Sequence, residues 1–533
     1  MLPQLRTDRR PRALLRRHWL AVLLVSVGLV LRVLTQLAYH PAILYIDSLK
    51  YLYNAWTGAD PVGYKVPLKI ILSVGDLGTV TAVQHLLGLL MAVLLYVLLQ
   101  RRGVSRWLAA LAMAPILLDA YQLEAEATIM PDVMFEALIV AALAVLLWQP
   151  SASWLAAAAT GLILGIGVTV REVGLILIVP AVLYLLLSRG PLLSRGGWLT
   201  AMGKSAALGA AFALPILAYC AVSYETTGHF WLSVKGSAAG RMAQAADCAT
   251  LRLPARERPM CPTPAEQRES PDWLEHASQS PLLRIAVPGT EREKMVSVFD
   301  KAVERQQPLR VVAAVLRDSV RLFEVDRTAT EAITPISRWQ FQTMYPVYIP
   351  EVTLKHNGAI IVGVQTHHSG PYRYHLLNPA YGGRAAVNRP LAAFLHGYQL
   401  DGGYTPGPLL LIFTLAGLAG SLLALAGRRT SRRCRQLALG SLLFFVSAAG
   451  LLLVADLYVF SWRYQLPALV TLPCAGVLGA AAVADQVRQR RAARAARPQA
   501  PSLSVPATRR RASTGVAGAG AAGSGVPGPA VTP

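Results

Sequence analysis

Long apolar stretches recur along this sequence, and they constrain its fold more than any other feature. The longer stretches hold roughly 17–22 residues each, enough for a helix to cross a hydrocarbon core about 30 Å thick. Hydrophobic residues make up 54% of the chain and charged residues only 15%, which is too apolar for a soluble protein of 533 residues. We therefore predict an all-α polytopic membrane protein with about ten transmembrane helices.

The apolar stretches and the arginine clusters together predict a topology. The expected spans are approximately residues 18–38, 79–100, 106–122, 129–148, 154–170, 173–188, 198–223, 406–427, 436–457 and 463–484. If the N-terminus is inside, the main arginine clusters fall in cytoplasmic segments, as the positive-inside rule requires. Both termini are then cytoplasmic, and the cell membrane is the expected location. We attribute the net charge of +22 to this topology and to anionic lipid, not to a nucleic-acid partner.

This topology divides the chain into five expected parts. They are a basic cytoplasmic N-terminus (1–17), a membrane module of about seven helices (18–223), an extracytoplasmic domain (224–405), a membrane module of about three helices (406–484) and a disordered basic cytoplasmic tail (485–533). The first outer loop, residues 39–78, is expected to be catalytic. The extracytoplasmic domain is expected to be mixed, with helical patterns near residues 290–326 and strand-like pieces near 345–374.

Several ionisable residues are predicted to meet at the outer membrane edge. They are Asp47 after the first span, the acidic turn with Glu126, the turn at Arg171, and Arg463-Tyr464 at the start of the last span. Ionisable residues at such positions are costly, and they are therefore candidates for function.

Asp47 is the first of these candidates. A carboxylate on a membrane surface beside aromatic rings can have a raised pKa and act as a general base. Asp47 also precedes the helical pattern Ser48-Leu49-Lys50-Tyr51, so a helix N-cap is an equal alternative.

A second acidic cluster contains Glu126 and Asp132. Pro131 suits the first turn of a helix, which places Asp132 at the positive end of the helix dipole. Asp132 can therefore be catalytic or a dipole partner, and Glu126 can be catalytic or simply solvated. Glu136, one turn further, is expected to make a structural hydrogen bond.

Cations are the third kind of candidate. Arg171 and Arg463 can neutralise a departing phosphate, since a guanidinium binds phosphate through two nitrogens. The alternatives are a surface turn of Arg171 with Glu172, and an Arg463 side chain reaching lipid headgroups. Lys65, on a second interfacial segment, can bind headgroups or substrate phosphate. Arg32 and His85 lie within spans and are expected to be core residues with local partners.

The sequence gives no evidence for ATP as an energy source or for a nicotinamide cofactor. It has no phosphate-binding loop and no dinucleotide glycine fingerprint. Oxygen ligands from Asp47 and Glu126 would suit a Mg²⁺ or Mn²⁺ ion, whereas His367, His368 and His375 lack companion ligands at a zinc spacing.

Two cysteines of the outer domain lie close together in sequence. A bridge between Cys248 and Cys261 would contribute about 3 kcal/mol, and two free thiols are the alternative.

These features, in this order, resemble the GT-C superfamily of membrane glycosyltransferases, which includes protein O-mannosyltransferases and lipid A aminoarabinose transferases. Ile46-Asp47-Ser48 resembles the acidic motif after the first span of these enzymes, and Glu126…Asp132 resembles their second acidic motif. The chain is also similar to actinobacterial lipid-carrier-dependent glycosyltransferases. The similar motifs are Asp47-Ser48-Leu49-Lys50-Tyr51, Leu118-Asp119-Ala120-Tyr121-Gln122-Leu123, Gly240-Arg241…Ala246-Asp247-Cys248 and Arg463-Tyr464-Gln465-Leu466-Pro467.

The resemblance implies a polyprenyl-phosphate sugar as donor and a lipid, glycan or protein acceptor approached from outside. It implies that Asp47 deprotonates the acceptor in one inverting displacement, while Arg171, Arg463 or a metal steadies the phosphate. A lipid-linked saccharide flippase, a polymer ligase and a non-enzymatic scaffold are the alternatives. A ligase would use arginine and histidine of the outer loop, such as Arg241, Arg373 and His375.

Overall fold

The computed structural model describes most of the chain. The described residues are 16–45, 47–53, 61–188, 195–233, 238–328, 330–344, 352–356, 359–363, 381–382, 386–426 and 431–495. The chain forms two compact units, Met1–Val487 and Arg488–Pro533. The predicted N-terminal segment (1–17) and the predicted tail (485–533) lie largely outside the described residues.

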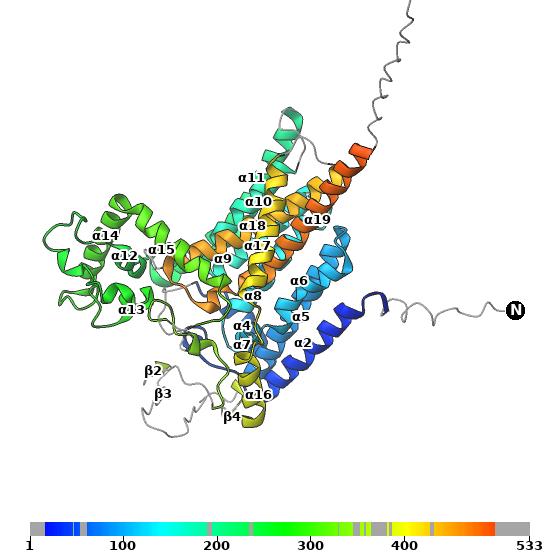
Figure 1. The fold of residues 1–533 in the computed structure, drawn as a ribbon. Coiled ribbons are helices and arrows are strands. Elements are labelled where there is room, and N and C mark those ends of the chain that lie inside the picture. The colour runs from blue at the N-terminus through cyan, green and yellow to red at the C-terminus, as the bar shows by residue number, and fades with distance from the viewer. Residues whose placement is uncertain are drawn as a thin grey trace, which may run out of the picture. The chain divides into compact units, whose positions relative to one another are not determined.

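The apolar stretches form helices (Figure 1). Among the described residues, six helices are long and apolar enough to cross a membrane: α2 (Trp19–Ala38), α5 (Leu77–Arg101), α11 (Arg195–Thr227), α17 (Gly407–Ala426), α18 (Arg432–Tyr458) and α19 (Pro467–Ala495). The prediction of an all-α membrane protein is thereby confirmed.

The other apolar stretches are helical but bent or short. Helices α6 (Arg106–Leu118) and α7 (Ala120–Ala127) qualify as a span only as a pair, bent by 51°. Helices α8 (Asp132–Leu147), α9 (Trp154–Val170) and α10 (Ile178–Leu187), with the 3-10 helix η1 (Glu172–Leu177) before α10, do not qualify. The predicted count of about ten spans is not confirmed, because a helix of about 16 residues is only about 24 Å long.

Short polar side chains begin several of these helices. Asp76, Ser105, Ser153 and Ser431 each accept a hydrogen bond from the backbone N–H three residues further on. Such caps satisfy N–H groups that have no partner within the helix.

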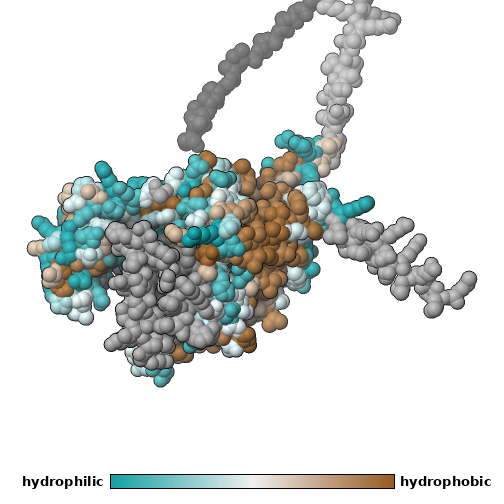
Figure 2. Space-filling view, turned by 90° about the horizontal axis from the view of Figure 1, so that it is seen from below, coloured by the Kyte–Doolittle hydropathy of each residue, from teal (hydrophilic) through white to brown (hydrophobic). Residues whose placement is uncertain are grey.

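The span helices expose apolar side chains. Large hydrophobic residues are exposed along α2, α5, α11 and α17, as expected for helices that face lipid. Figure 2 shows apolar residues gathered over one part of the surface and polar residues over the part formed by the chain between α11 and α17.

We call the chain between α11 and α17, which is predicted to be extracytoplasmic, the outer segment. Its first part has a hydrophobic core of its own. Helices α12 (Ala239–Ala245), α13 (Pro271–His276), α14 (Gly289–Gln306) and α15 (Pro308–Val320), with the 3-10 helices η2 (Arg258–Met260) and η3 (Glu266–Arg268), surround it. Its buried residues include Met260, Leu274 and Phe299. A disulfide joins Cys248 to Cys261, with 5.9 Å between their Cα atoms.

The rest of this segment returns to the membrane helices. It contains the 3-10 helices η4 (Arg321–Phe323) and η5 (Ile336–Trp339), the antiparallel strands β2 (Val352–His356) and β3 (Ala359–Gly363), and helix α16 (Arg389–Leu400). The short strand β4 (Ala386–Val387) pairs with β1 (Tyr39–His40), directly after α2. The first outer loop thus lies beside the end of the outer segment.

Two short helices lie between α2 and α5. They are α3 (Ser48–Tyr53) and α4 (Lys65–Leu72). A further 3-10 helix, η7 (Trp462–Gln465), precedes α19. Most of the candidate residues lie on these three elements, or next to them, and at the starts of α8 and η1.

Candidate active site

Backbone hydrogen bonds join the first outer loop to the start of α8. The N–H of Ile43 donates to the carbonyl of Ala127 (2.9 Å), and the N–H of Ile129 donates to the carbonyl of Ile43 (3.1 Å). The buried hydroxyl of Ser48 donates to the carbonyl of Ile129 (3.0 Å). These bonds fix Asp47, which precedes Ser48, near the end of the acidic turn.

Asp132 lies at the first residue of α8, and two arginines bind its carboxylate. Nη1 of Arg171 lies 2.5 Å from Oδ1. Nη2 and Nε of Arg463 lie 2.8 Å and 3.0 Å from Oδ2. Both cations therefore meet a carboxylate that the positive end of a helix dipole also favours.

The two arginines come from distant parts of the chain. Arg171 ends α9, and its own N–H donates to the carbonyl of Gly167 (2.9 Å). Arg463 lies in η7, just before the last long helix. The alternative surface turn of Arg171 with Glu172 is not seen, since Glu172 accepts a hydrogen bond from Ser233 (2.6 Å).

Asp47 completes this group. Its Oδ2 lies 3.3 Å from Nη1 of Arg463, and its Oδ1 lies 3.0 Å from Nζ of Lys50. The Asp47 side chain keeps 25% of its surface exposed, whereas the Asp132 side chain keeps 7%. We call Asp47, Lys50, Asp132, Arg171 and Arg463 the edge cluster. It combines three cations with two carboxylates, of which Asp47 is the more accessible.

Aromatic rings line the edge cluster. The guanidinium of Arg171 lies 5.0 Å from the ring centroid of Tyr464, and that of Arg463 lies 5.0 Å from the ring of Trp339. Trp339 in turn packs against Tyr45 with 4.7 Å between centroids. Burial raises the pKa of Tyr45 to about 12, so this phenol stays protonated near neutral pH. Cation–π contacts of this kind hold the guanidinium planes in fixed orientations.

Lys65 begins α4, next to a turn that docks on α9. The N–H of Gly63 donates to the carbonyl of Thr169 (2.8 Å), two residues before Arg171. The Lys65 side chain is half-buried, and burial, with Lys69 nearby, lowers its pKa. Lys65 thus lies on the segment that borders the edge cluster on the α9 side.

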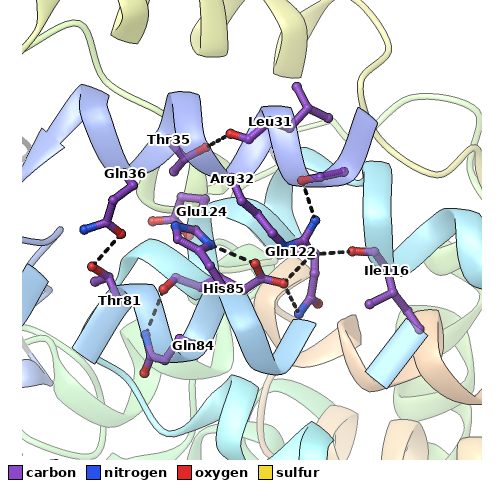
Figure 3. A network of polar contacts seen from close by, with 12 residues as sticks. Leu31, Arg32, Thr35, Gln36, Thr81, Gln84, His85, Ile116, Gln122 and Glu124 are labelled. Carbon is purple, nitrogen blue, oxygen red and sulfur yellow. Dashed lines mark hydrogen bonds and ion pairs between the residues drawn. The ribbon is translucent and has the colours of Figure 1, made fainter. Parts of the chain in front are cut away.

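Glu126 lies elsewhere, in a buried network. Figure 3 shows its partners Arg32, His85 and Gln122 pointing toward one another. Oε1 of Glu126 lies 2.7 Å from Nη2 of Arg32 on α2, and its Oε2 lies 2.9 Å from Nδ1 of His85 on α5. Gln122 donates to Glu136 (2.8 Å) and, at 3.4 Å, to Glu126. We call Arg32, His85, Gln122, Glu126 and Glu136 the core cluster.

The core cluster changes the interpretation of Glu126. The alternative of a solvated outer turn was wrong, because α7 folds back between α2 and α5 and buries all of its residues. The expected structural hydrogen bond of Glu136 is confirmed. Arg32 and His85 are core residues as expected, but their shared partner, Glu126, is distant in sequence.

Asp47 and Glu126, the two carboxylates considered for a divalent cation, have different cationic partners. Cationic side chains contact both carboxylates: Arg463 and Lys50 bind Asp47, and Arg32 binds Glu126. A metal ion would have to displace these cations. Over the described part of the chain, no group of three or more His, Cys, Asp or Glu side chains could hold a metal. His367, His368, Arg373 and His375 lie outside that part.

Arg241 is buried in the contact between the outer segment and the membrane helices. Its Nη2 lies 2.6 Å from Oδ2 of Asp318 on α15 and donates to the carbonyl of Asp456 on α18 (2.7 Å). Its Nη1 donates to Gln244 (2.5 Å). Only 1% of the side chain is exposed, so it is not available to a substrate in this structure.

Sequence reasoning missed two residues near the edge cluster. Trp339 covers Arg463 from the outer segment. Arg327 binds Asp119 (2.9 Å) and lies within 5.1 Å of the ring centroids of Tyr121, Tyr404 and Trp462, the neighbour of Arg463. Asp119 belongs to a motif quoted for the resemblance, so an acidic residue at a break between two apolar helices was the available signal.

Part of the sequence matches a known family. Residues 75–233 match the family model described as dolichyl-phosphate-mannose-protein mannosyltransferase. This match confirms the resemblance to the GT-C superfamily of membrane glycosyltransferases that the motifs predicted. No curated protein matches the chain.

Two solved structures are similar to the chain at low identity. One is the S. cerevisiae protein O-mannosyltransferase complex bound to the sugar donor (18% identity, TM-score 0.31, 41% of this chain and 35% of that chain). The other is the oligosaccharyltransferase AglB from Archaeoglobus fulgidus with an inhibitory peptide and a dolichol-phosphate (12% identity, TM-score 0.36, 92% of this chain and 53% of that chain). The chain therefore spans about a third of the first and about half of the second.

Proposed function

We propose that this chain, a membrane glycosyltransferase of the GT-C superfamily, transfers a sugar from a polyprenyl-phosphate donor to an acceptor on the extracytoplasmic side. One observation carries the proposal: the accessible Asp47 carboxylate shares Arg463 with the buried Asp132, and Arg171 binds the same Asp132. A base and two fixed cations thus lie within one ion-pair network. The description of the matched family names a lipid-phosphate sugar, which supports this class of donor.

In the proposed reaction Asp47 is the general base. Its carboxylate accepts the proton of the acceptor hydroxyl, and the hydroxyl oxygen attacks the anomeric carbon from the face opposite the phosphate. The bond between that carbon and the phosphate oxygen breaks, and its electron pair stays on the lipid phosphate. One displacement of this kind inverts the anomeric configuration.

The cations of the edge cluster stabilise the departing phosphate. Asp132 forms ion pairs with Arg171 and Arg463. The rings of Tyr464 and Trp339 hold the guanidinium groups of these arginines in place. Donors that are fixed before the reaction need no reorganisation as negative charge develops. We assign Tyr464 to orienting Arg171 and Arg463, and Lys65 to binding the phosphate from the adjoining segment.

The rest of the chain supports this centre. The membrane modules, residues 18–223 and 406–484, supply the edge cluster, and the domain of residues 224–405 shapes the acceptor side through Trp339. In this proposal both termini are cytoplasmic and the protein lies in the cell membrane. Glu126 and Arg241 hold the structure together and do not touch substrate.

The test is sugar transfer from radiolabelled polyprenyl-phosphate sugars, hexoses and pentoses alike, into membranes that contain the protein. The variant is Asp47→Asn at matched expression. The matched control is Asp401→Asn, which removes the same charge from an exposed aspartate at the end of α16.

We expect transfer by the unmodified chain and by the control, and a loss of about 10²–10⁴-fold with Asp47→Asn. Equal transfer by Asp47→Asn would exclude Asp47 as the base. An absence of transfer from every donor would contradict the proposed reaction itself.

A further inference from the structure

Helix α15 of the outer segment carries an exposed apolar face that the proposed reaction does not use. Leu309, Val312, Leu316 and Val320 have 80%, 51%, 50% and 62% of their surface exposed. At 100° per residue these positions fall on one side of the helix. A soluble domain rarely exposes an apolar stripe of this kind without a partner for it.

The opposite side of α15 is buried. Val311, Ala314, Val315 and Asp318 pack against the other helices of the outer segment and against α18. Helix α15 therefore has two apolar faces, one in contact with protein and one exposed. Only the exposed face needs a partner that the described chain does not supply.

The contacts of α15 place it at the outer ends of two span helices. Ser319 donates to Oδ2 of Asp456 (2.6 Å), two residues before the end of α18. The backbone of Phe323 and Glu324, just after α15, lies against Gly407 at the start of α17 so closely that a Cβ would not fit. The C-terminal end of α18 and the N-terminal end of α17 lie on the same side of the predicted membrane. Because α15 contacts both ends, it lies at the boundary between the membrane and the outer side.

The direction of α15 agrees with this position. Figure 1 shows α15 beside α18 and running across it. A helix that lies across the ends of spans lies along the membrane surface.

Arginines lie along one edge of the exposed face. Arg310 and Arg317 are exposed on α15, and Arg321 follows directly in η4. Arg310 also lies 3.5 Å from Asp247, and Arg321 lies 3.5 Å from Asp318. An amphipathic helix with an apolar face and flanking arginines is the type that binds anionic membrane surfaces.

We propose that α15 is an interfacial helix that docks the outer domain on the outer leaflet of the bilayer. Leu309, Val312, Leu316 and Val320 enter the region between headgroups and acyl chains, and Arg317 meets anionic headgroups. The partner is the lipid surface itself. This inference does not depend on sugar transfer.

Depth measurements on the full chain test the proposal. A cysteine is introduced as Leu316→Cys and labelled with a fluorophore, in nanodiscs that contain one copy of the protein and phosphatidylglycerol. The native Cys220, Cys434 and Cys474 are buried, and Cys248 and Cys261 are joined, so the new thiol is the reactive one. The matched control is Lys301→Cys, on an exposed position of α14.

We expect a nitroxide near the carbonyl end of the acyl chains to quench the Leu316→Cys label several-fold more than the Lys301→Cys label. Aqueous iodide should show the reverse order. Because each nanodisc holds one copy and no other protein, no second copy and no partner protein can shield the label. Iodide quenching of the Leu316→Cys label equal to that of the control, in a monodisperse sample, would overturn the proposal.

A second comparison tests the arginine. With phosphatidylcholine in place of phosphatidylglycerol, the nitroxide should quench the Leu316→Cys label less. Adding Arg317→Gln should remove this difference between the two lipids. If the difference in quenching between the two lipids stays the same, Arg317 does not bind the anionic headgroups. The depth measurement above then tests the apolar contact by itself.

Discussion

The two ionisable clusters of this molecule use the same residue types in opposite ways. In the edge cluster the carboxylate of Asp47 is a quarter exposed and contacts Lys50 and Arg463. In the core cluster Arg32 and Glu126 are 2% and 0% exposed, and their charges balance. A buried, balanced pair stabilises one arrangement of helices, because each charge is costly without the other. An accessible carboxylate beside fixed cations is suited to accept a proton and to stabilise a departing anion.

Removing the cation of the core cluster should act on the stability of the protein and not on sugar transfer. Arg32→Met leaves Glu126 buried with His85 as its remaining basic partner. We expect the free energy of unfolding to fall by about 3–5 kcal/mol, with transfer per folded molecule unchanged. Denaturant unfolding in detergent measures it.

The control for this prediction is the double variant Arg32→Met with Glu126→Gln. It removes both charges and should recover part of the lost stability. A lower transfer rate per folded molecule in Arg32→Met would show that the core cluster takes part in catalysis.

Removing a cation of the edge cluster should act mainly on the reaction. With Arg463→Gln, Asp132 keeps Arg171, but the leaving phosphate loses the arginine that contacts both Asp132 and Asp47. We expect sugar transfer to fall by about 10²–10³-fold, or about 2.7–4 kcal/mol in the barrier. The transfer assay described above measures it.

Arg463→Lys separates charge from geometry at this position. It keeps the charge but loses the contact of two nitrogens with Asp132, so its transfer should be intermediate. Full activity in Arg463→Gln would mean that the phosphate leaves elsewhere.

Packing around the core cluster offers a smaller test. A Cβ at Gly88 of α5 would collide with Oε1 of Glu126 and lie 2.7 Å from Nη2 of Arg32. We expect Gly88→Ala to lower the free energy of unfolding by about 1–3 kcal/mol. The control is Gly209→Ala on α11, where a Cβ meets no atom within 4 Å. The control should be neutral or stabilising, and equal effects in both variants would argue against tight packing of the core cluster.

Asp76 lies outside both clusters, and its substitution should have the smallest effect on the free energy of unfolding. Its carboxylate caps α5, and the hydrogen bond from the N–H of Thr79 (2.9 Å) holds the pKa of that carboxyl below its usual value. Asp76→Ala should lower the free energy of unfolding by about 0.5–2 kcal/mol at neutral pH.

The pH dependence of this capping effect has a defined sign. A lowered folded-state pKa stabilises the protein above the unfolded pKa, and the stabilisation disappears as the pH falls through the folded value. The difference between Asp76→Ala and the unmodified chain should therefore shrink in acid. Asp76→Asn retains a capping oxygen and should lose less stability. A gap that is constant with pH would exclude the carboxylate as its source.

The edge cluster could largely be predicted from the sequence because topology alone brings its members together. Asp47, Asp132, Arg171 and Arg463 each adjoin an apolar stretch on the same predicted side. Which carboxylate binds which arginine could not be predicted, since the ion pairs depend on how the helix ends pack. The structure joins both arginines to Asp132 and leaves Asp47 more exposed.

The core cluster was beyond sequence reasoning for a physical reason. Glu126 follows a bend of 51° after α6, and its depth depends on where α7 turns. At that bend Arg32 also donates to the carbonyls of Ile116 (3.0 Å) and Leu117 (3.1 Å). Hydropathy reports the apolar stretch but not the direction of the chain after the bend, so Glu126 was assigned to an outer turn.

Arg32 also bears on how the protein is assembled in the membrane. It belongs to the first span, and its carboxylate partner is synthesised 94 residues later. An arginine near the centre of a span costs about 2.5–3.5 kcal/mol on insertion, and the leucines and valines of α2 offset that cost at about 0.3–0.6 kcal/mol each. The first helix can thus enter the bilayer alone, but its charge is neutralised only when α7 arrives. Any nascent chain that stops before Glu126 therefore keeps Arg32 without its carboxylate partner in the first span.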